Sequence, residues 1–172
     1  MNFRELAAAR YSVRKFKTDP VEKEKLDLII EALRNAPTAA NRQPQRVLVV
    51  ASEEGLRKMD QVTPCRFGAP LVLLICYDSE ACWVRPTDKQ DSGFVDASIV
   101  TAQAMLQAAD LGLGSTWVMF FDAAKARQEF GIPENLIPVA VLPLGYPAPD
   151  AAPSDFHAQR LPADKLVFFE RM

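Results

Sequence analysis

The chain has 172 residues, 49% of them hydrophobic and 24% charged, which is ordinary for one soluble globular domain. Its 20 basic and 22 acidic residues give a net charge of −2, without the basic excess of nucleic-acid-binding proteins. One histidine and three irregularly spaced cysteines match no zinc pattern. We expect no metal site, reduced cysteines and no nucleic-acid partner.

The sequence also carries no sign of a membrane protein. No apolar run reaches the roughly 18 residues that span a bilayer. The start lacks the basic stretch and apolar run of a secretory signal. We therefore expect a cytoplasmic protein with no membrane partner.

Helix and strand signals alternate along the first half. Phe3 and Leu6 share a face of an expected helix, and the stretch 10–16 alternates polar and apolar residues, which predicts an extended segment. Asp19, Pro20 and Glu22 resemble a helix start. The expected elements are a helix over 3–9, a helix from 20 that stops before Pro37, a turn over 37–44, a strand over 47–51, a helix over 53–60 capped by Ser52, a strand over 71–77 and an irregular excursion over 78–93.

The second half holds the strongest helical signal, over residues 95–111. This helix has no charge between Asp96 and Asp110, and a helix that is apolar nearly all round must be covered on all sides. We expect a second subunit to supply part of that cover. The remaining elements are a strand over 116–121, a helix over 123–130 capped by Asp122, a strand over 139–142, a connector over 148–154 and a strand over 166–169 that could pair with either subunit. This alternation predicts a central sheet flanked by helices.

A candidate anion site lies in the extended segment. Residues 10, 12 and 14 project to one face of an extended chain, so the guanidiniums of Arg10 and Arg14 would lie beside the Ser12 hydroxyl. Clustered positive charges favour an anion such as phosphate, which arginine binds through two hydrogen bonds. The alternative is a solvated face that pairs with acidic neighbours, and both remain open on this spacing.

Two turns and one arginine complete the candidate residues. Asn41 and Gln43 carry amides that both donate and accept, as the edge of a flat heterocycle such as a flavin requires, although a plain polar turn fits them too. Gly112 and Gly114 permit close approach to a ligand or simply end a helix. Arg160 taken alone is a surface arginine. No Gly-x-Gly-x-x-Gly motif supports a Rossmann site.

Taken together and in order, these segments resemble the nitroreductase family of flavoproteins. The first matches Arg-x-Ser-x-Arg-x-Phe, and the second is similar to Ala-Pro-Ser-x-x-Asn-x-Gln-Pro with Thr38 in place of serine. The matching segments are Arg10-Tyr11-Ser12-Val13-Arg14-Lys15-Phe16, residues 36–44, residues 109–117, Gly131-Ile132-Pro133-Glu134, Leu144-Gly145-Tyr146-Pro147 and Arg160-Leu161-Pro162. The resemblance covers nearly the whole chain.

The resemblance implies an α+β fold of three layers (α/β/α). A mixed central sheet would be flanked by helices, with residues 1–172 as a single domain in an intertwined homodimer. Two FMN molecules would lie at the subunit interface. The implied flavin-binding residues are Arg10, Tyr11, Ser12, Arg14, Trp117 and Arg160, together with Pro37, Thr38, Ala39, Asn41 and Gln43 from the other subunit.

By the same resemblance, the protein passes a hydride from NADH or NADPH through the flavin to a small organic acceptor such as a nitroaromatic, a quinone or an activated alkene. The flavin carries the chemistry, so no catalytic side chain is expected. The alternatives are another redox reaction, such as dehydrogenation or dehalogenation, or a flavin-binding dimer without catalysis. Trp83, Arg85 or Phe67 could line the acceptor pocket, with core packing favoured for Phe67.

Two departures from the family pattern bear on these roles. Phe120 and Phe121 stand where relatives have a glycine pair, and they would narrow the space near the flavin or pack beneath it. Ala158 stands where many relatives carry a basic residue. Phosphate binding would then depend more on arginines 10, 14 and 160.

Overall fold

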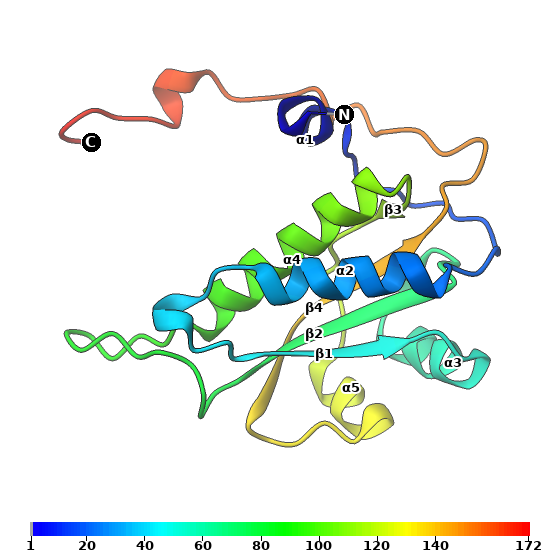
Figure 1. Cartoon of the computed structure of the whole chain (residues 1–172), viewed down its shortest axis with the longest axis horizontal. Helices are drawn as coiled ribbons and strands as arrows, with labels where there is room; N and C mark the ends of the chain where they lie inside the picture. Colours follow the sequence, from blue (N-terminus) through cyan, green and yellow to red (C-terminus); the bar gives the residue numbers. More distant parts are fainter. Residues whose placement is uncertain (1) are drawn as a thin grey trace.

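A four-stranded sheet forms the centre of the computed structural model, which describes residues 2–172 (Figure 1). The strand order is β1-β2-β4-β3 and all three ladders are antiparallel. A parallel pairing is added by the Ser12–Ser115 bridge, outside the named strands. The strands are β1 (Gln45–Val50), β2 (Leu71–Asp78), β3 (Gly114–Ser115) and β4 (Leu136–Gly145).

Helices cover both faces of this sheet (Figure 1). They are α1 (Phe3–Ala9), α2 (Lys23–Asn35), α3 (Glu53–Val62), α4 (Gly93–Asp110) and α5 (Ala123–Phe130), with short 3-10 turns η1 (Ala39–Asn41), η2 (Pro64–Arg66) and η3 (Ala163–Lys165). Alternate residues of β2 face opposite ways, as a strand requires: Leu73 packs with α2 and α4, and Leu74 packs with α3 and α5. The three-layer α+β fold is confirmed.

The helix caps read from the sequence are in part confirmed. The Ser52 and Asp122 side chains accept backbone N–H groups at the starts of α3 and α5. The expected start of α2 at Asp19 and Pro20 is wrong. Glu22 is the N-cap, with an extended backbone, and both its carboxylate oxygens lie 2.8 Å from the Tyr146 hydroxyl that donates to them. This link to a distant turn holds residues 19–22 outside the helix.

The expected strand over 116–121 is also wrong, because β3 ends at Ser115. Thr116 donates to the Pro143 carbonyl at 3.4 Å, and proline has no N–H to return a ladder bond. Pairing resumes only as an isolated bridge between Val118 and Val141. The proline in β4 thus interrupts a segment whose composition favours a strand.

The expected strand over 166–169 is wrong within this chain. Residues 156–172 form a tail that runs along the top of Figure 1 and contains turns, among them η3, but no strand. A strand needs a neighbour for its backbone groups, and β1, at the sheet edge, lies on the opposite side of the molecule (Figure 1). The apolar side chains of the tail are exposed, among them Leu166, Val167, Phe168 and Phe169.

The apolar helix α4 is only partly covered by its own chain. Its inner face is buried against the sheet and α2, with Ala97, Val100 and Ala104 fully inaccessible. On its outer face, Phe94 and Val95 remain about half exposed, at 49% and 53%. The chain therefore leaves this face of α4 partly exposed.

Candidate functional site

The segment carrying Arg10, Ser12 and Arg14 is fixed by one buried valine. Val13 is 2% exposed, and its N–H donates to the Ser115 carbonyl at 3.0 Å. A Cβ on Gly114 would lie 2.6 Å from the Val13 side chain, so this glycine permits close approach of another part of the chain rather than of a ligand. Because Val13 points inward, the residues on either side of it point outward.

The base of the C-terminal tail is tied to the same segment. Lys15 and Asp150 form an ion pair at 2.5 Å, and the Tyr11 hydroxyl donates to the Ala151 carbonyl at 3.4 Å. The rings of Tyr11 and His157 meet edge to face, with centroids 6.1 Å apart. These contacts carry Arg160 to the segment that holds the other two candidate arginines.

The result is a cavity of about 310 Å³ that we call the arginine cavity. Its lining residues come from two segments far apart in sequence: Arg10, Tyr11, Ser12, Arg14, Ser154, Phe156, His157 and Arg160. No acidic residue lines it, and within residues 2–172 none of its guanidiniums forms an ion pair. Unpaired positive charges held together favour the binding of an anion.

The loop over residues 37–43 forms a second, separate region. Ala40, Asn41 and Gln43 all have positive φ, between 50° and 53°, which is costly for residues other than glycine. The Gln43 N–H donates to the Thr38 hydroxyl at 3.0 Å, and the Gln43 amide donates to the Asn41 side-chain oxygen at 3.1 Å. Both amides are exposed, so this strained turn presents donors and acceptors to the outside.

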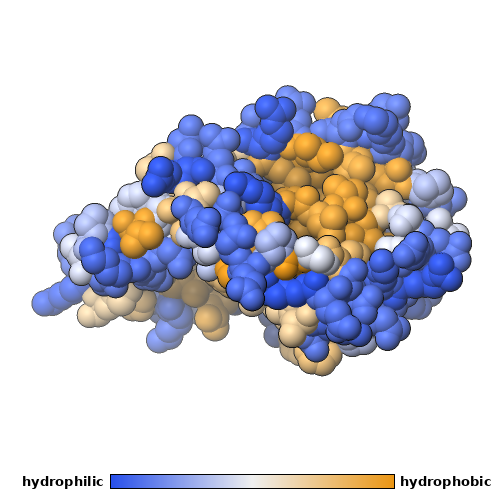
Figure 2. All heavy atoms as spheres, turned by 90° about the horizontal axis from the view of Figure 1, so that it is seen from below, coloured by the Kyte–Doolittle hydropathy of each residue, from blue (hydrophilic) through white to orange (hydrophobic). Residues whose placement is uncertain are grey.

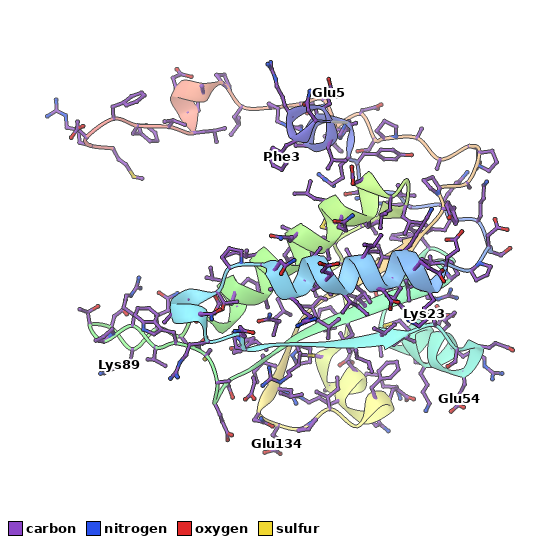
Figure 3. All side chains as sticks on the ribbon, in the orientation of Figure 1. Phe3, Glu5, Lys23, Glu54, Lys89 and Glu134 are labelled. Atoms are coloured by element: carbon purple, nitrogen blue, oxygen red, sulfur yellow. The ribbon has the colours of Figure 1, made fainter. Side chains whose placement is uncertain are left out.

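The 37–43 loop does not reach the arginine cavity of its own chain. Ala39 instead lines a different cavity, of about 360 Å³, which we call the Trp83 cavity. The other lining residues belong to the excursion after β2 and to α4: Trp83, Arg85, Gln90, Asp91, Ser92, Val95, Asp96 and Ile99. Lys89 marks the tip of this excursion, which lies at the same end of the molecule as η1 (Figure 3).

The remaining candidates lie apart from both cavities. The indole N–H of Trp117 is buried and has no hydrogen-bond partner within residues 2–172. Phe120 is 72% exposed, whereas Phe121 and Phe67 pack against the core beneath α3 and α5. Neither Phe120 nor Phe121 narrows the arginine cavity.

Sequence reasoning missed two parts of these sites. His157 lines the arginine cavity, but only its distant contact with Tyr11 places it there, and nothing local in the sequence signals that. Asp96 is 1% exposed and accepts the Ala39 N–H at 2.8 Å. Its signal was present, since it is the lone charge at the start of an otherwise apolar helix.

Two of the three cysteines are buried and poorly suited to nucleophilic attack. Burial raises the pKa of the Cys76 thiol to about 11 and also raises the pKa of Cys82, so both stay protonated near neutral pH. In residues 2–172, no group of three or more histidine, cysteine, aspartate or glutamate side chains could hold a metal ion. No helix in the same range combines the length and apolarity needed to cross a membrane.

Known proteins match this fold and its site segments. The model of the nitroreductase family matches residues 7–67 and 64–146. A protein of Methanothermobacter thermautotrophicus, named as an NADH dehydrogenase/NAD(P)H nitroreductase, is 32% identical over 180 residues, covering 96% of this chain and 88% of its own.

Solved structures agree. A nitroreductase family protein from Clostridium difficile has a TM-score of 0.94 and 41% identity, with both chains covered completely. A nitroreductase from Exiguobacterium sibiricum, in complex with FMN, shares the fold with a TM-score of 0.84 at 22% identity, covering 99% of this chain and 98% of its own. The fold and the matches together define an oxidoreductase class. The chain belongs to the nitroreductase family.

Proposed function

We propose that the protein is an FMN-dependent oxidoreductase that moves a hydride from NADH or NADPH to a small organic acceptor, such as a nitroaromatic, a quinone or an activated alkene. The observation that carries the proposal is the arginine cavity, where Arg10, Arg14 and Arg160 meet without an acidic partner. The Methanothermobacter relative is named for NAD(P)H, and the Exiguobacterium neighbour holds FMN. Both support the proposal.

The residues present fit FMN on chemical grounds. A phosphate ester is the kind of anion that three guanidiniums and the Ser12 hydroxyl bind well. The exposed Asn41 and Gln43 amides of the second region offer the donors and acceptors that a flavin edge requires.

Each group would have a distinct task. Bound FMN supplies the hydride acceptor and donor that no side chain of the protein provides. The arginine cavity would hold the phosphate, whose negative charge its three guanidiniums would stabilise. Pro37, Thr38 and Ala39 carry the amides of the 37–43 loop into place. No side chain needs to act as a nucleophile or an acid.

We further propose an intertwined homodimer, because one chain cannot bring its two regions together. The 37–43 loop lies off the arginine cavity of its own chain, so a second copy would supply the loop for each flavin. The tail offers a means of assembly. The β1 edge is open, with Leu48 and Val49 each 37% exposed, and a hollowed apolar area is visible on the underside of the molecule (Figure 2). The exposed residues 166–169 suit an added strand at such an edge.

The flavin proposal is tested by titration. The purified protein should be yellow or become so with FMN, and NADH or NADPH should bleach it rapidly under anaerobic conditions. A colourless protein that stays so with added FMN would reject every flavin function. Bound flavin that neither nicotinamide bleaches would reject the reductase and leave another redox reaction or a carrier.

The homodimer is tested by the molar mass in solution. The unmodified chain should be a dimer, and Val49→Asp on β1 or Phe169→Asp in the tail should shift it towards monomer, because each places a charge in the proposed contact. Phe120→Ser is the matched control, since Phe120 is exposed but lies outside both segments. A monomeric wild-type protein contradicts the assembly.

A further inference from the structure

Asp96 is a buried carboxylate with a task other than capping its own helix. It is 1% exposed, and a buried charge is costly unless it is hydrogen-bonded. One oxygen accepts the Ala39 N–H at 2.8 Å and the other accepts the Ser92 hydroxyl at 2.7 Å. In the described chain it accepts no N–H from the first turn of α4. One oxygen therefore connects α4 to the 37–43 loop, and the other bonds to Ser92, the N-cap residue of α4, which itself contacts the excursion.

The first connection fixes the root of the 37–43 loop. Ala39 directly precedes the residues of positive φ, Ala40 and Asn41. Such conformations persist only where the surroundings hold them. The Ala39 bond to Asp96 at one end and the Gln43 bond to Thr38 at the other help to hold this turn. Its other hydrogen bonds are made within the turn or by Arg46, which donates to the Gln43 carbonyl at 3.1 Å.

The second connection reaches the neck of the excursion after β2. Ser92 and Trp83 exchange two hydrogen bonds: the Ser92 N–H donates to the Trp83 carbonyl at 2.8 Å, and the Trp83 N–H donates to the Ser92 hydroxyl oxygen at 3.1 Å. That hydroxyl in turn donates to Asp96. The Trp83 cavity lies where α4, the excursion and the loop meet, and Asp96 joins all three.

We propose that Asp96 is a positioning residue that holds the 37–43 loop in its flavin-binding shape and couples that loop to Trp83 and Ser92 in the wall of the Trp83 cavity. This inference rests on the proposed function. The loop would meet the flavin ring, whereas the arginine cavity would meet the phosphate. Loss of Asp96 should therefore weaken FMN and riboflavin alike, since riboflavin is the same ring system without the phosphate.

The test compares Asp96→Ala, Asp96→Asn and Ser92→Ala with Ser98→Ala, whose hydroxyl bonds only to the Phe94 carbonyl of its own helix. Dissociation constants for FMN and riboflavin come from flavin fluorescence, and the shape of the site comes from visible circular dichroism of the bound flavin. Asp96→Ala should weaken both flavins equally, about tenfold, the scale of one lost hydrogen bond to a charged group, and should change the dichroism.

The conservative variant separates position from charge. An asparagine oxygen can still accept the Ala39 N–H, and its amide can donate to Ser92. Asp96→Asn should keep both affinities within about twofold of wild type. Ser92→Ala removes the hydroxyl that joins Asp96 to the Trp83 N–H and keeps the Asp96 bond to Ala39 and the backbone bond to the Trp83 carbonyl. Because Trp83 lines the proposed acceptor pocket, this variant should raise the acceptor KM and leave the rate of flavin reduction unchanged. Ser98→Ala should match wild type throughout.

If the wild-type protein binds flavin, three results overturn this inference alone. They are equal affinity of Asp96→Ala and wild type for both flavins, a loss of affinity in Asp96→Ala confined to FMN, and a tenfold loss of affinity in Asp96→Asn. If Asp96→Ala does not fold, a tenfold loss in Asp96→Asn still rejects the flavin role, and an unchanged acceptor KM in Ser92→Ala rejects the coupling. A wild-type protein that binds neither flavin overturns the proposed function, and this inference falls with it.

Discussion

The two regions proposed to bind the flavin are built in opposite ways. The arginine cavity is assembled from side chains whose sequence positions differ by up to 150, from Arg10 to Arg160, and its charges have no acidic partner. The 37–43 loop is assembled from adjacent residues whose backbone is held in a strained turn by Thr38 and Asp96. One region gathers three arginines around a cavity, and the other presents the Asn41 and Gln43 amides on a turn whose backbone is already shaped.

This difference predicts separable contributions to affinity. The arginine cavity should act on the phosphate through charge, so it should distinguish FMN from riboflavin. The loop should act on the ring through hydrogen bonds, so it should treat both flavins alike. Each prediction below measures both ligands for this reason.

The largest effect is expected for Arg10→Ala. Removing one guanidinium from the cavity should weaken FMN binding by about 1.5–3 kcal/mol, the usual scale of a charge-assisted hydrogen bond, with little change for riboflavin. Isothermal titration or fluorescence quenching gives both constants. Arg57→Ala is the control, because Arg57 is an exposed arginine on α3, 4.0 Å from Glu53. An unchanged FMN constant would contradict the phosphate site.

Next in size is Thr38→Val. The Thr38 hydroxyl accepts the Gln43 N–H at 3.0 Å, and valine removes that acceptor with nearly the same shape. The turn should loosen, and both flavins should bind about 1 kcal/mol more weakly. Thr38→Ser keeps the hydroxyl and should bind as wild type does. Weaker binding of FMN alone would place Thr38 at the phosphate and contradict the separate roles of the two regions.

The contrast between the regions also explains how far sequence reasoning could go. A period of two placed Arg10, Ser12 and Arg14 on one face, and the structure brings them together because Val13 anchors the segment through Ser115. The position of Arg160 beside Arg10 and Arg14 could be predicted only from the family resemblance. The contacts that bring it there, Lys15 with Asp150 and Tyr11 with Ala151 and His157, join residues at least 135 positions apart, which local patterns cannot connect.

The errors have the same origin in distant partners. Pro143 interrupts the strand pairing expected over 116–121. The hydrogen bond from Tyr146 to Glu22 holds residue 22 at the cap position, outside α2. The positive φ angles at Ala40 and Gln43 carry no signal in residue type, whereas asparagine, as at Asn41, is enriched in that conformation. Fold class depends on patterns repeated over many residues, and it was predictable, whereas these features depend on single contacts.

A smaller effect is expected from salt. The distance over which salt screens a charge shortens from about 10 Å at 0.1 M ionic strength to about 3 Å at 1 M. Arg14 and Arg160 are exposed, so their charges are open to this screening. FMN should therefore bind several-fold more weakly at the higher salt concentration, while riboflavin should not respond. Parallel salt titrations of the two ligands measure this directly. Equal salt dependence for both would mean that charge does not separate the regions.

The smallest effect tests whether His157 belongs to the proposed phosphate site. His157 lines the arginine cavity and meets the Tyr11 ring edge to face, so it could donate to the phosphate or only support the base of the tail. Phenylalanine keeps the ring contact and removes both ring nitrogens. If His157 binds phosphate, His157→Phe should weaken FMN by about 0.5 kcal/mol, the low end for one hydrogen bond, with riboflavin unchanged. Equal FMN affinity in the two proteins would restrict the phosphate site to the arginines and Ser12, because the ring contact alone would then account for the place of His157.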